Sequence, residues 1–434
     1  MFDLPVEINT VLDRLEESGF EAFLVGGAVR DMIMAKQVHD YDVATSAEPD
    51  ETERVFSDLR VVKTGVKHGT VTVIINGMPV EITSYRRESS YSDGRHPDHV
   101  SFSKNIYDDL SRRDLTINAI AYSKSKGVAD PFGGVSDIEN RIIRCVGSPE
   151  ERFTEDHLRL LRAMRFAATS GFTVEENTKK AIHEKRELIR TVSSERIFSE
   201  LCRLICGQFA KDVMHEYSDV IFQIIPELAV QKGCIVEYGE FSYDLYDHTV
   251  NCLSYTEPLL HLRLAALLHD TVKPSGASAE DAEHIRDTAA KNVLLRLRCA
   301  GALSDSVRRI IRYNGVQADP SDKVGIKRLA SKLGIRTLKD VLKLERADIL
   351  AEDPRYYYRL NELNAVLDVI TEVEENGTAL SLKDLAVNGS DVISLGVKPG
   401  PAVGELLRYA LDAVISEKVE NEKDPLLSFI SLRI

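Results

Sequence analysis

The stretch Leu24-Val25-Gly26-Gly27-Ala28-Val29-Arg30-Asp31 runs from apolar residues through two glycines into helix-forming residues. This order predicts a strand, a tight turn and the start of a helix. Glycines at such a turn let backbone N–H groups approach a phosphate, and a helix N-terminus favours its negative charge. A plain turn is the commoner interpretation of a double glycine, so the phosphate-site hypothesis depends on further residues.

Two acidic residues follow shortly after this turn. Asp40-Tyr41-Asp42 is predicted to lie on a strand, where the two-residue period places both carboxylates on one face of a sheet. Carboxylates held in this way can bind Mg²⁺ ions that clamp the attacking and leaving oxygens of a phosphoryl displacement. Glu81, on a later predicted strand, could supply a third carboxylate. The alternative is that these are solvated acids on exposed strands.

The chain around these residues changes character near residue 150. Before it, short β-branched runs alternate with helical segments, and Asn76-Gly77 predicts a hairpin turn between strands at Thr70–Ile75 and Val80–Ser84. After it, most segments have helical spacing. We therefore predict an α+β head with a small mixed sheet, followed by a long all-α region. The predicted domains are a head with the candidate metal site at 1–148, a helical neck at 149–210, a body at 211–320 and a tail at 321–434.

Composition excludes several classes of protein. The chain has 434 residues, of which 43% are hydrophobic and 29% charged, and no apolar run is long enough to cross a membrane. The N-terminal residues show neither a signal-peptide nor a transit-peptide pattern, so we expect a cytoplasmic protein. The six cysteines include no Cys-x-x-Cys pair, which argues against disulfides and a cysteine zinc site.

The charge is distributed unevenly. A net charge of −14 argues against a nucleic-acid ligand, but eight basic residues and only two acidic ones lie between Lys323 and Arg346. We call six of them the basic strip: Lys323, Lys327, Arg328, Lys332, Arg336 and Lys339. Such a strip predicts either an RNA-binding surface or a solvated helix face.

Several motifs occur together in a recognisable order. The double glycine, Arg30 and Asp40-x-Asp42 resemble the head of polymerase-β-like nucleotidyltransferases. The segments that follow are Lys63 to Val73, Arg112 to Ala121, Asp130 to Gly134 and Glu155 to Phe166. This series resembles the motifs of class II tRNA nucleotidyltransferases, the bacterial and eukaryotic CCA-adding enzymes of the poly(A) polymerase and tRNA nucleotidyltransferase superfamily. The resemblance is close from residue 22 to about 172, looser to about 310, and returns near Asn388–Asp391 and Pro399–Pro401.

The resemblance implies a transferase that adds C, C and then A to the 3′ end of tRNA from CTP and ATP, with Mg²⁺ as cofactor. It assigns the metals to Asp40 and Asp42, and catalytic roles to these two, Glu81 and Arg113. The nucleotide-binding residues that it implies are Gly26, Gly27, Arg30, Arg113, Asp114, Asn118, Asp156, Arg159, Arg162 and Arg165. The basic strip would meet the acceptor arm of tRNA, which is recognised by shape and backbone. The sequence leaves protein partners and the oligomeric state open.

The segment from Glu155 to Phe166 has a chemical interpretation of its own. Arg159, Arg162 and Arg165 recur at every third position of a predicted helix, with Asp156 just before them. In the resemblance, Asp156 accepts a hydrogen bond from the amino group of cytosine or adenine, and Arg159 donates to the adjacent ring acceptor. The alternative is a salt bridge within the helix from Glu155 to Arg159.

Arg86 to Phe102 is a polar segment punctuated by glycine and proline, and we predict a loop there. In the resembling family this place holds a flexible loop that CC-only enzymes lack, so its presence favours addition of the terminal A. An enzyme that adds only A remains an alternative. A poly(A) polymerase is less well supported, because Thr64 to Val73 lacks the more basic sequence of those enzymes.

A second possible centre lies in the predicted body. His248, followed by His269-Asp270, resembles the first two elements of an HD metal-dependent phosphohydrolase. The expected Gly-His-Glu segment is represented only by Glu283-His284, and no final aspartate is evident. A more distant alternative is therefore an HD-type phosphohydrolase with a nucleotide-sensing head. The intact Asp40-x-Asp42 set favours the transferase.

Overall fold

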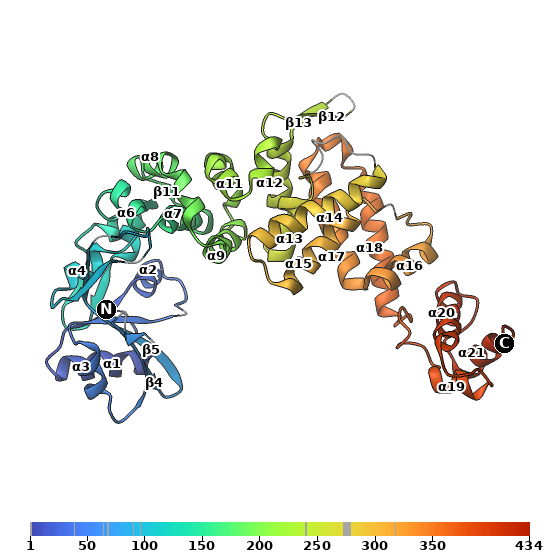
Figure 1. Ribbon diagram of the computed structural model, residues 1–434, viewed down its shortest axis with the longest axis horizontal. Helices are drawn as coiled ribbons and strands as arrows, with labels where there is room; N and C mark the ends of the chain where they lie inside the picture. Colours follow the sequence, from blue (N-terminus) through green and yellow to red (C-terminus); the bar gives the residue numbers. More distant parts are fainter. Residues whose placement is uncertain are drawn as a thin grey trace. The chain divides into compact units, whose positions relative to one another are not determined.

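The computed structural model describes residues 2–38, 40–63, 65–66, 69–89, 91–95, 97–238, 241–271, 279–316 and 318–434. The chain forms two compact units, Met1–Pro226 and Glu227–Ile434, and each is described by itself. The predicted α+β head followed by a long helical region is confirmed (Figure 1). The boundaries predicted at residues 148, 210 and 320 stay predictions. None of the helices within the described residues is both long and apolar enough to span a membrane.

A seven-stranded mixed sheet forms the centre of the first unit, in the order β3-β4-β5-β2-β1-β8-β9. The strands are β1 (Ala22–Val25), β2 (Asp42–Thr45), β3 (Arg60–Val62), β4 (Thr70–Ile75), β5 (Met78–Ser84), β8 (Ala121–Ser123) and β9 (Gly127–Ala129). Only β2 and β5 are parallel. Asn76 and Gly77 both have positive φ between β4 and β5, which confirms the predicted hairpin. In the Lys63 to Val73 motif, Thr64, Lys67 and His68 lie outside the described residues.

Apolar periodicity explains how this sheet is covered. All four residues of β1 are buried, and α1 (Val6–Glu17) buries Ile8, Val11, Leu12 and Leu15 on one face. This spacing of three and four residues is that of an amphipathic helix. The remaining helices of the head are α2 (Gly27–Ile33), α3 (Pro49–Val55), α4 (Ile106–Ser111) and α5 (Gly134–Glu139).

The turn between β1 and α2 explains one wrong prediction. Gly26 has a φ of 70°, which favours glycine, and it ends the pairing of β1. The last pair of β1 and β2 is Val25 with Asp42. Asp40 and Tyr41 therefore have no partner on this side and lie just outside the strand on which they were predicted.

The predicted loop at Arg86–Phe102 is in part a hairpin. Strands β6 (Arg86–Ser89) and β7 (His99–Phe102) pair antiparallel with each other, apart from the main sheet. Alternate residues of β6 and all four residues of β7 are exposed. Without a buried face these strands lack the hydrophobic alternation that predicts a strand, which is why the segment had the pattern of a loop.

Helices follow the head within the first unit. They are α6 (Pro149–Glu155), α7 (Leu158–Ser170), α8 (Glu176–Glu184), α9 (Ser194–Ile205), α10 (Ala210–Glu216) and α11 (Ser218–Ile224). A two-residue parallel pair, β10 (Ile142–Ile143) and β11 (Thr173–Val174), joins the head to this helical part. Helix α7 packs against α9, and together with the head they position the site described below (Figure 1).

The second unit begins with a small hairpin and is otherwise helical. The hairpin is β12 (Ile235–Tyr238) with β13 (Phe241–Asp244). The helices are α12 (Leu245–Tyr255), α13 (Leu260–Leu268), α14 (Ala279–Arg296), α15 (Gly301–Tyr313), α16 (Lys323–Leu333), α17 (Ile335–Ala351), α18 (Arg359–Glu375), α19 (Gly389–Ser394), α20 (Pro401–Ile415) and α21 (Lys423–Ser431). One apolar core lies among α16, α17 and α18, and another among the last three helices.

Candidate active site

A pocket of about 460 Å³ in the first unit brings most of the predicted site residues together. The predicted residues that line it are Gly26, Gly27, Arg30, Asp42, Arg113, Asp114, Asn118, Asp156, Arg159, Arg162 and Arg165. Asp40 and Glu81 are not among its lining residues. Eight arginines and three aspartates line the pocket in all, so it is strongly positive and suits a polyphosphate.

Three carboxylates lie near the start of β2, and one of them, that of Asp42, lines the pocket. Asp42 is the first residue of β2 and lies directly opposite Glu81 of the parallel strand β5. Desolvation by the surrounding protein atoms raises the pKa of Asp42, Arg113 opposes this effect, and the negative charges of Glu81 and Asp40 raise the pKa further. A divalent cation would relieve this repulsion, so the residues fit such an ion. Their oxygens are nevertheless not gathered within 4.8 Å of one another, and a nucleotide would have to complete the coordination.

The double-glycine turn leaves room for two arginines. A Cβ atom at Gly26 would lie 2.9 Å from Nη1 of Arg113, so a side chain there would displace the guanidinium. Arg30 donates to Oδ1 of Asn118 (2.7 Å), and Arg113 donates to Oδ2 of the buried Asp109 (3.1 Å). These contacts hold both guanidinium groups at the pocket wall.

Asp114 lines the pocket and contacts several of its neighbours, and its predicted role in nucleotide binding stays a prediction. Its carboxylate accepts hydrogen bonds from Arg162 (2.7 Å), from Asn118 (3.2 Å) and from the N–H of Leu115 (2.9 Å). Burial alone would raise the pKa of Asp114, but Arg162 and the hydrogen bonds lower it to about 2. Asp114 is therefore ionised and already engaged, and it positions Arg162 in the pocket.

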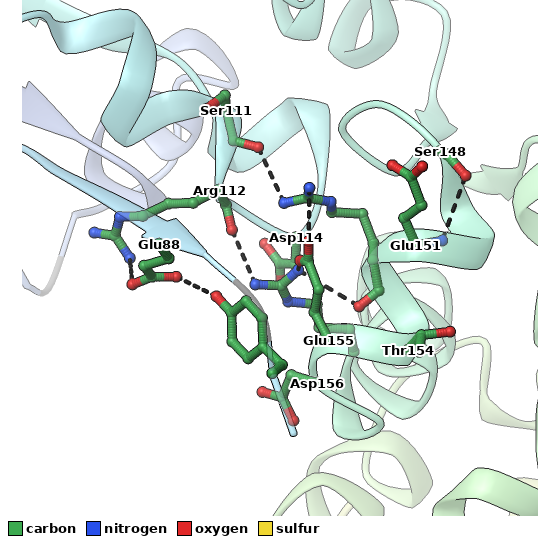
Figure 2. Close-up of polar contacts among 12 residues, drawn as sticks. Glu88, Ser111, Arg112, Asp114, Ser148, Glu151, Thr154, Glu155 and Asp156 are labelled. Carbon is green, nitrogen blue, oxygen red and sulfur yellow. Dashed lines mark hydrogen bonds and ion pairs between the residues drawn. The ribbon is translucent and has the colours of Figure 1, made fainter. Parts of the chain in front are cut away.

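Asp156 and Arg159 both line the pocket, but they are not paired with each other. Asp156 lies between α6 and α7, outside either helix, and accepts from Nη2 of Arg196 (2.9 Å). Arg159 pairs with Glu155 (2.6 Å) and donates to the carbonyl of Arg112 (2.9 Å); Figure 2 labels Glu155, Arg112 and Asp156. The alternative salt bridge is thus present, although it joins two helices instead of lying within one. Its presence does not remove Arg159 from the pocket.

Four pocket residues were not predicted: Arg112, Phe166, Arg196 and Arg203. Arg196 and Arg203 are seven residues apart on α9, so they share a helix face. Their spacing in the sequence indicates that both lie on one face of a helix, but nothing in the sequence shows that α9 packs beside α7. Arg165 stacks on Phe166, with its guanidinium carbon 3.9 Å from the ring centre, and pairs with Glu200.

Acidic side chains from elsewhere in the second unit offset part of the positive charge of the basic strip. Four of its residues form ion pairs within the second unit, namely Lys323 with Glu372, Lys327 with Glu417, Arg328 with Asp412 and Lys339 with Glu374. The acidic partners come from α18, from α20 and from Glu417, far along the sequence. Lys332 and Arg336 are exposed, and no ion pair of theirs occurs within the described residues. These ion pairs reduce the net positive charge that the strip presents, and tRNA binding by its six residues stays a prediction.

Comparison with known proteins first establishes the class. Residues 22–144 match the family described as "Poly A polymerase head domain", and residues 282–430 match tRNA nucleotidyltransferase domain 2. The Bacillus stearothermophilus CCA-adding enzyme in complex with CTP has a similar structure, with a TM-score of 0.74 and 27% identity over 98% of this chain and 96% of that one. The class is that of nucleotidyltransferases with a polymerase-type head.

The sequence relatives are more specific. A CCA-adding enzyme of Lactobacillus helveticus is 33% identical over 99% of this chain and 97% of its own length. Another, of Lactobacillus delbrueckii subsp. bulgaricus, is 34% identical over 97% and 96%. The chain belongs to the CCA-adding enzyme family, which confirms the resemblance found in the sequence.

Proposed function

We propose that this chain adds C, C and A in turn to the 3′ end of tRNA, using CTP and ATP and dependent on Mg²⁺. In each step the 3′ hydroxyl attacks the α-phosphorus, a new phosphodiester bond forms, and pyrophosphate leaves with the electrons of the broken bond. The observation that carries this proposal is a single pocket that is lined by eight arginines, by the carboxylate of Asp42 and by both Asp156 and Arg159.

The residues divide this work by charge. Asp40 and Asp42, with Glu81 beside them, would hold the divalent cations, which supply charge neutralisation at the reacting phosphate. Arg30 and Arg113 bind the triphosphate, and the small residues Gly26 and Gly27 let it approach the backbone. Arg162 and Arg165 add further positive charge to the pocket.

Base choice follows from hydrogen-bond polarity. The carboxylate of Asp156 only accepts, and the guanidinium of Arg159 only donates. Cytosine and adenine each present an amino donor beside a ring acceptor, which matches this pair. Uracil and guanine present a carbonyl where the amino group is needed. When CTP or ATP binds, Arg159 has to contact the base as well as its present partner Glu155. In the same way, Asp156 has to contact the base as well as Arg196.

The test is incorporation into tRNA that lacks its last three nucleotides. With CTP alone we expect two additions, and with CTP and ATP three. Asp42→Asn should abolish incorporation in both incubations. The control is Asp58→Asn, which changes an exposed acid paired with Arg14 in the same unit and should leave incorporation intact. Addition of A to tRNA ending in CC, without any addition of C, would support the A-only alternative. Full incorporation by Asp42→Asn would contradict the assignment of the metal site.

A further inference from the structure

A second cavity of the first unit adjoins the nucleotide pocket, and the reaction proposed above assigns no role to it. Its volume is about 410 Å³. Four residues of α2, α7 and α9 line both cavities: Arg30, Arg165, Phe166 and Arg203. The second cavity, which we call the side groove, is lined in addition by Lys36, just after α2. The nucleotide pocket thus continues into a second space across the residues that the two cavities share.

Lys36 and Arg203 give the side groove exposed positive charge. Neither side chain forms an ion pair within the part of the chain that the structure describes. Asp31 is the only acid among the described residues that line the groove, and it pairs with Arg30 at 2.9 Å. Four basic residues against one acid make the groove positive, so it suits an anion.

An aromatic ring holds two arginines where the cavities meet. The guanidinium carbon of Arg165 lies 3.9 Å from the ring centre of Phe166, and that of Arg30 lies 5.1 Å from it. Phe166 is only 9% exposed, so its ring is held by the atoms around it. A guanidinium stacked on a ring keeps its N–H donors at its edge, where an anion can accept from them.

Like charges lie close together at this boundary. Burial lowers the pKa of Arg165, the carboxylate of Glu200 opposes this effect, and the positive charges of Arg162 and Arg203 lower the pKa further. An anion beside Arg165 and Arg203 would reduce this repulsion. The boundary between the cavities therefore favours a negatively charged group on the side of the groove as well as on the side of the pocket.

The direction of the proposed reaction connects this boundary with the leaving group. The attacking and leaving oxygens of a phosphoryl transfer are roughly in line, so pyrophosphate departs away from the incoming 3′ hydroxyl. In the proposed function Asp42 lies at the reacting phosphate, and Asp156 and Arg159 lie at the base. None of these three residues lines the side groove, whereas Arg30, which binds the triphosphate, does. The groove therefore adjoins the phosphate end of the nucleotide.

Pyrophosphate has to leave a pocket that binds anions strongly. It keeps several negative charges after the bond is broken, and eight arginines against three aspartates line the nucleotide pocket. The next nucleotide needs the same arginines, so pyrophosphate has to move before each further addition. Lys36 and Arg203 offer it positive charge directly beside the pocket.

We propose that the side groove is a second anion site, which takes pyrophosphate from the nucleotide pocket after each addition. The proposal rests on the proposed function, because pyrophosphate is the product of that reaction. No bond forms or breaks in the groove. Lys36 and Arg203 donate charge-assisted hydrogen bonds to the oxygens of the anion, and the next CTP or ATP can enter the pocket while pyrophosphate is still in the groove.

Equilibrium dialysis of the full chain tests this proposal, with differently labelled CTP and pyrophosphate, excess Mg²⁺ and no tRNA. No addition takes place, so both ligands are counted as bound molecules. We expect the chain saturated with CTP to bind pyrophosphate and to keep its CTP. Lys36→Glu should weaken the binding of pyrophosphate at least about tenfold, and Lys36→Arg much less, because it is the charge of Lys36 that attracts the anion.

Lys180 supplies a matched control. It is an exposed lysine of α8 in the same unit, pairs with Glu184 at 3.8 Å and lines neither cavity. Lys180→Glu changes the net charge by the same amount and should bind pyrophosphate as the parent does. The proposal is overturned if pyrophosphate displaces CTP from the parent mole for mole, or if Lys36→Glu and Lys180→Glu bind pyrophosphate equally well.

Two further outcomes would assign the groove to another ligand and overturn the proposal. An equal loss of CTP and pyrophosphate binding in Lys36→Glu would assign Lys36 to the bound nucleotide. Weaker binding of tRNA with unchanged binding of pyrophosphate would make the groove a site for RNA phosphate. Because the dialysis contains no tRNA, its result is independent of the incorporation test. A chain that binds both ligands and adds no nucleotide would contradict the proposed function and still show the second anion site.

Discussion

At the scale of single residues, the base choice that we propose depends most directly on the carboxylate of Asp156. Its removal takes away the acceptor that favours the amino groups of cytosine and adenine. A mismatched buried polar group costs about 1–3 kcal/mol, or roughly ten- to a hundredfold in discrimination. We expect Asp156→Ala to admit UTP and GTP at rates approaching those of CTP and ATP, with all four slower than in the parent. Single-nucleotide incorporation with each triphosphate measures this, and a retained strict choice would place base reading elsewhere.

Arg196 positions that carboxylate without being part of the Asp156–Arg159 pair. It holds Asp156 through contacts of 2.9 and 3.2 Å from α9. We expect Arg196→Gln to lower the preference for CTP over UTP by roughly threefold to tenfold, while Arg196→Lys restores part of it. Arg190→Gln, at an exposed arginine just before α9, is the control. A loss of rate with unchanged base preference would show that Arg196 serves only structure or phosphate binding.

Glu345 gives a prediction about pH. It lines a pocket of about 570 Å³ in the second unit, with Arg359 and Glu362. Desolvation raises the pKa of Glu345 to about 7, against the attraction of Arg359 and with the help of the charge on Asp348. In the unfolded chain the pKa of Glu345 is near its ordinary value of 4.5, so the unfolded chain releases this proton at a lower pH than the folded protein does. The free energy of unfolding therefore falls as the pH rises from about 4.5 to about 7.

Glu345→Gln removes this titration. We expect its free energy of unfolding to exceed that of the parent by up to about 3 kcal/mol at pH 8, and the difference to shrink towards pH 4.5. Urea unfolding at several pH values, with a chelator present, measures it. Glu362→Gln, at an exposed acid of the same pocket, is the control. A difference that does not vary with pH would contradict the expected titration.

At the scale of elements, the β6–β7 hairpin contacts the residue that precedes α7, the helix that carries Arg159. Within the connection between these strands, Gly94 accepts at its carbonyl from the N–H of His157 (3.2 Å), just before α7. Glu88 of β6 contacts Arg112 (3.2 Å), whose carbonyl accepts from Arg159; Figure 2 shows Glu88 and Arg112. The hairpin is thus connected directly to His157 and, through Arg112, to Arg159, which we propose as a base-reading residue.

Gly94→Ala tests that connection. A Cβ atom there would lie 2.2 Å from Cε1 of His157, so either the imidazole of His157 or the hairpin must shift, and the contact between them changes. If the hairpin reshapes the pocket for the larger base, addition of A to tRNA ending in CC should fall at least about tenfold, and addition of C much less. Gly127→Ala has a similar positive φ with no atom within 4 Å of its Cβ, and it controls for backbone strain. Equal losses for A and C would mean that the hairpin supports catalysis in general.

At the scale of the whole molecule, an acidic chain has to bind a polyanion. With a net charge of −14 overall and four strip residues already paired, the exposed Lys332 and Arg336 are the strip residues best placed to meet phosphate. We expect Lys332→Ala with Arg336→Ala to weaken tRNA binding and reduce its salt slope by about 1 to 2, with CTP affinity unchanged. Lys323→Ala, whose side chain is paired with Glu372, should have a smaller effect. An unchanged slope in the double variant would assign tRNA binding to other surfaces.

The sequence by itself determined those features that depend on neighbouring residues or on motifs in a given order. The β1–α2 turn at Gly26, the Asn76-Gly77 hairpin, the arginine row of α7 and the change from a mixed head to helices are local patterns, and all are found in the structure. Local backbone preferences and apolar periodicity produce these features, so a reader of the chain can recover them. The ordered motifs identified the family in the same way.

Only the tertiary structure decided which distant side chains meet. In the tertiary structure Asp156 accepts from Arg196, and Asp114 accepts from Arg162. Four residues of the basic strip form ion pairs with acidic side chains. Asp348 contacts His248, from which it is separated by 100 residues of sequence. Each of these contacts depends on how one helix packs against another, through apolar faces that resemble those of any amphipathic helix. Because such faces specify burial and not a particular partner, the charges they bring together cannot be read from local sequence.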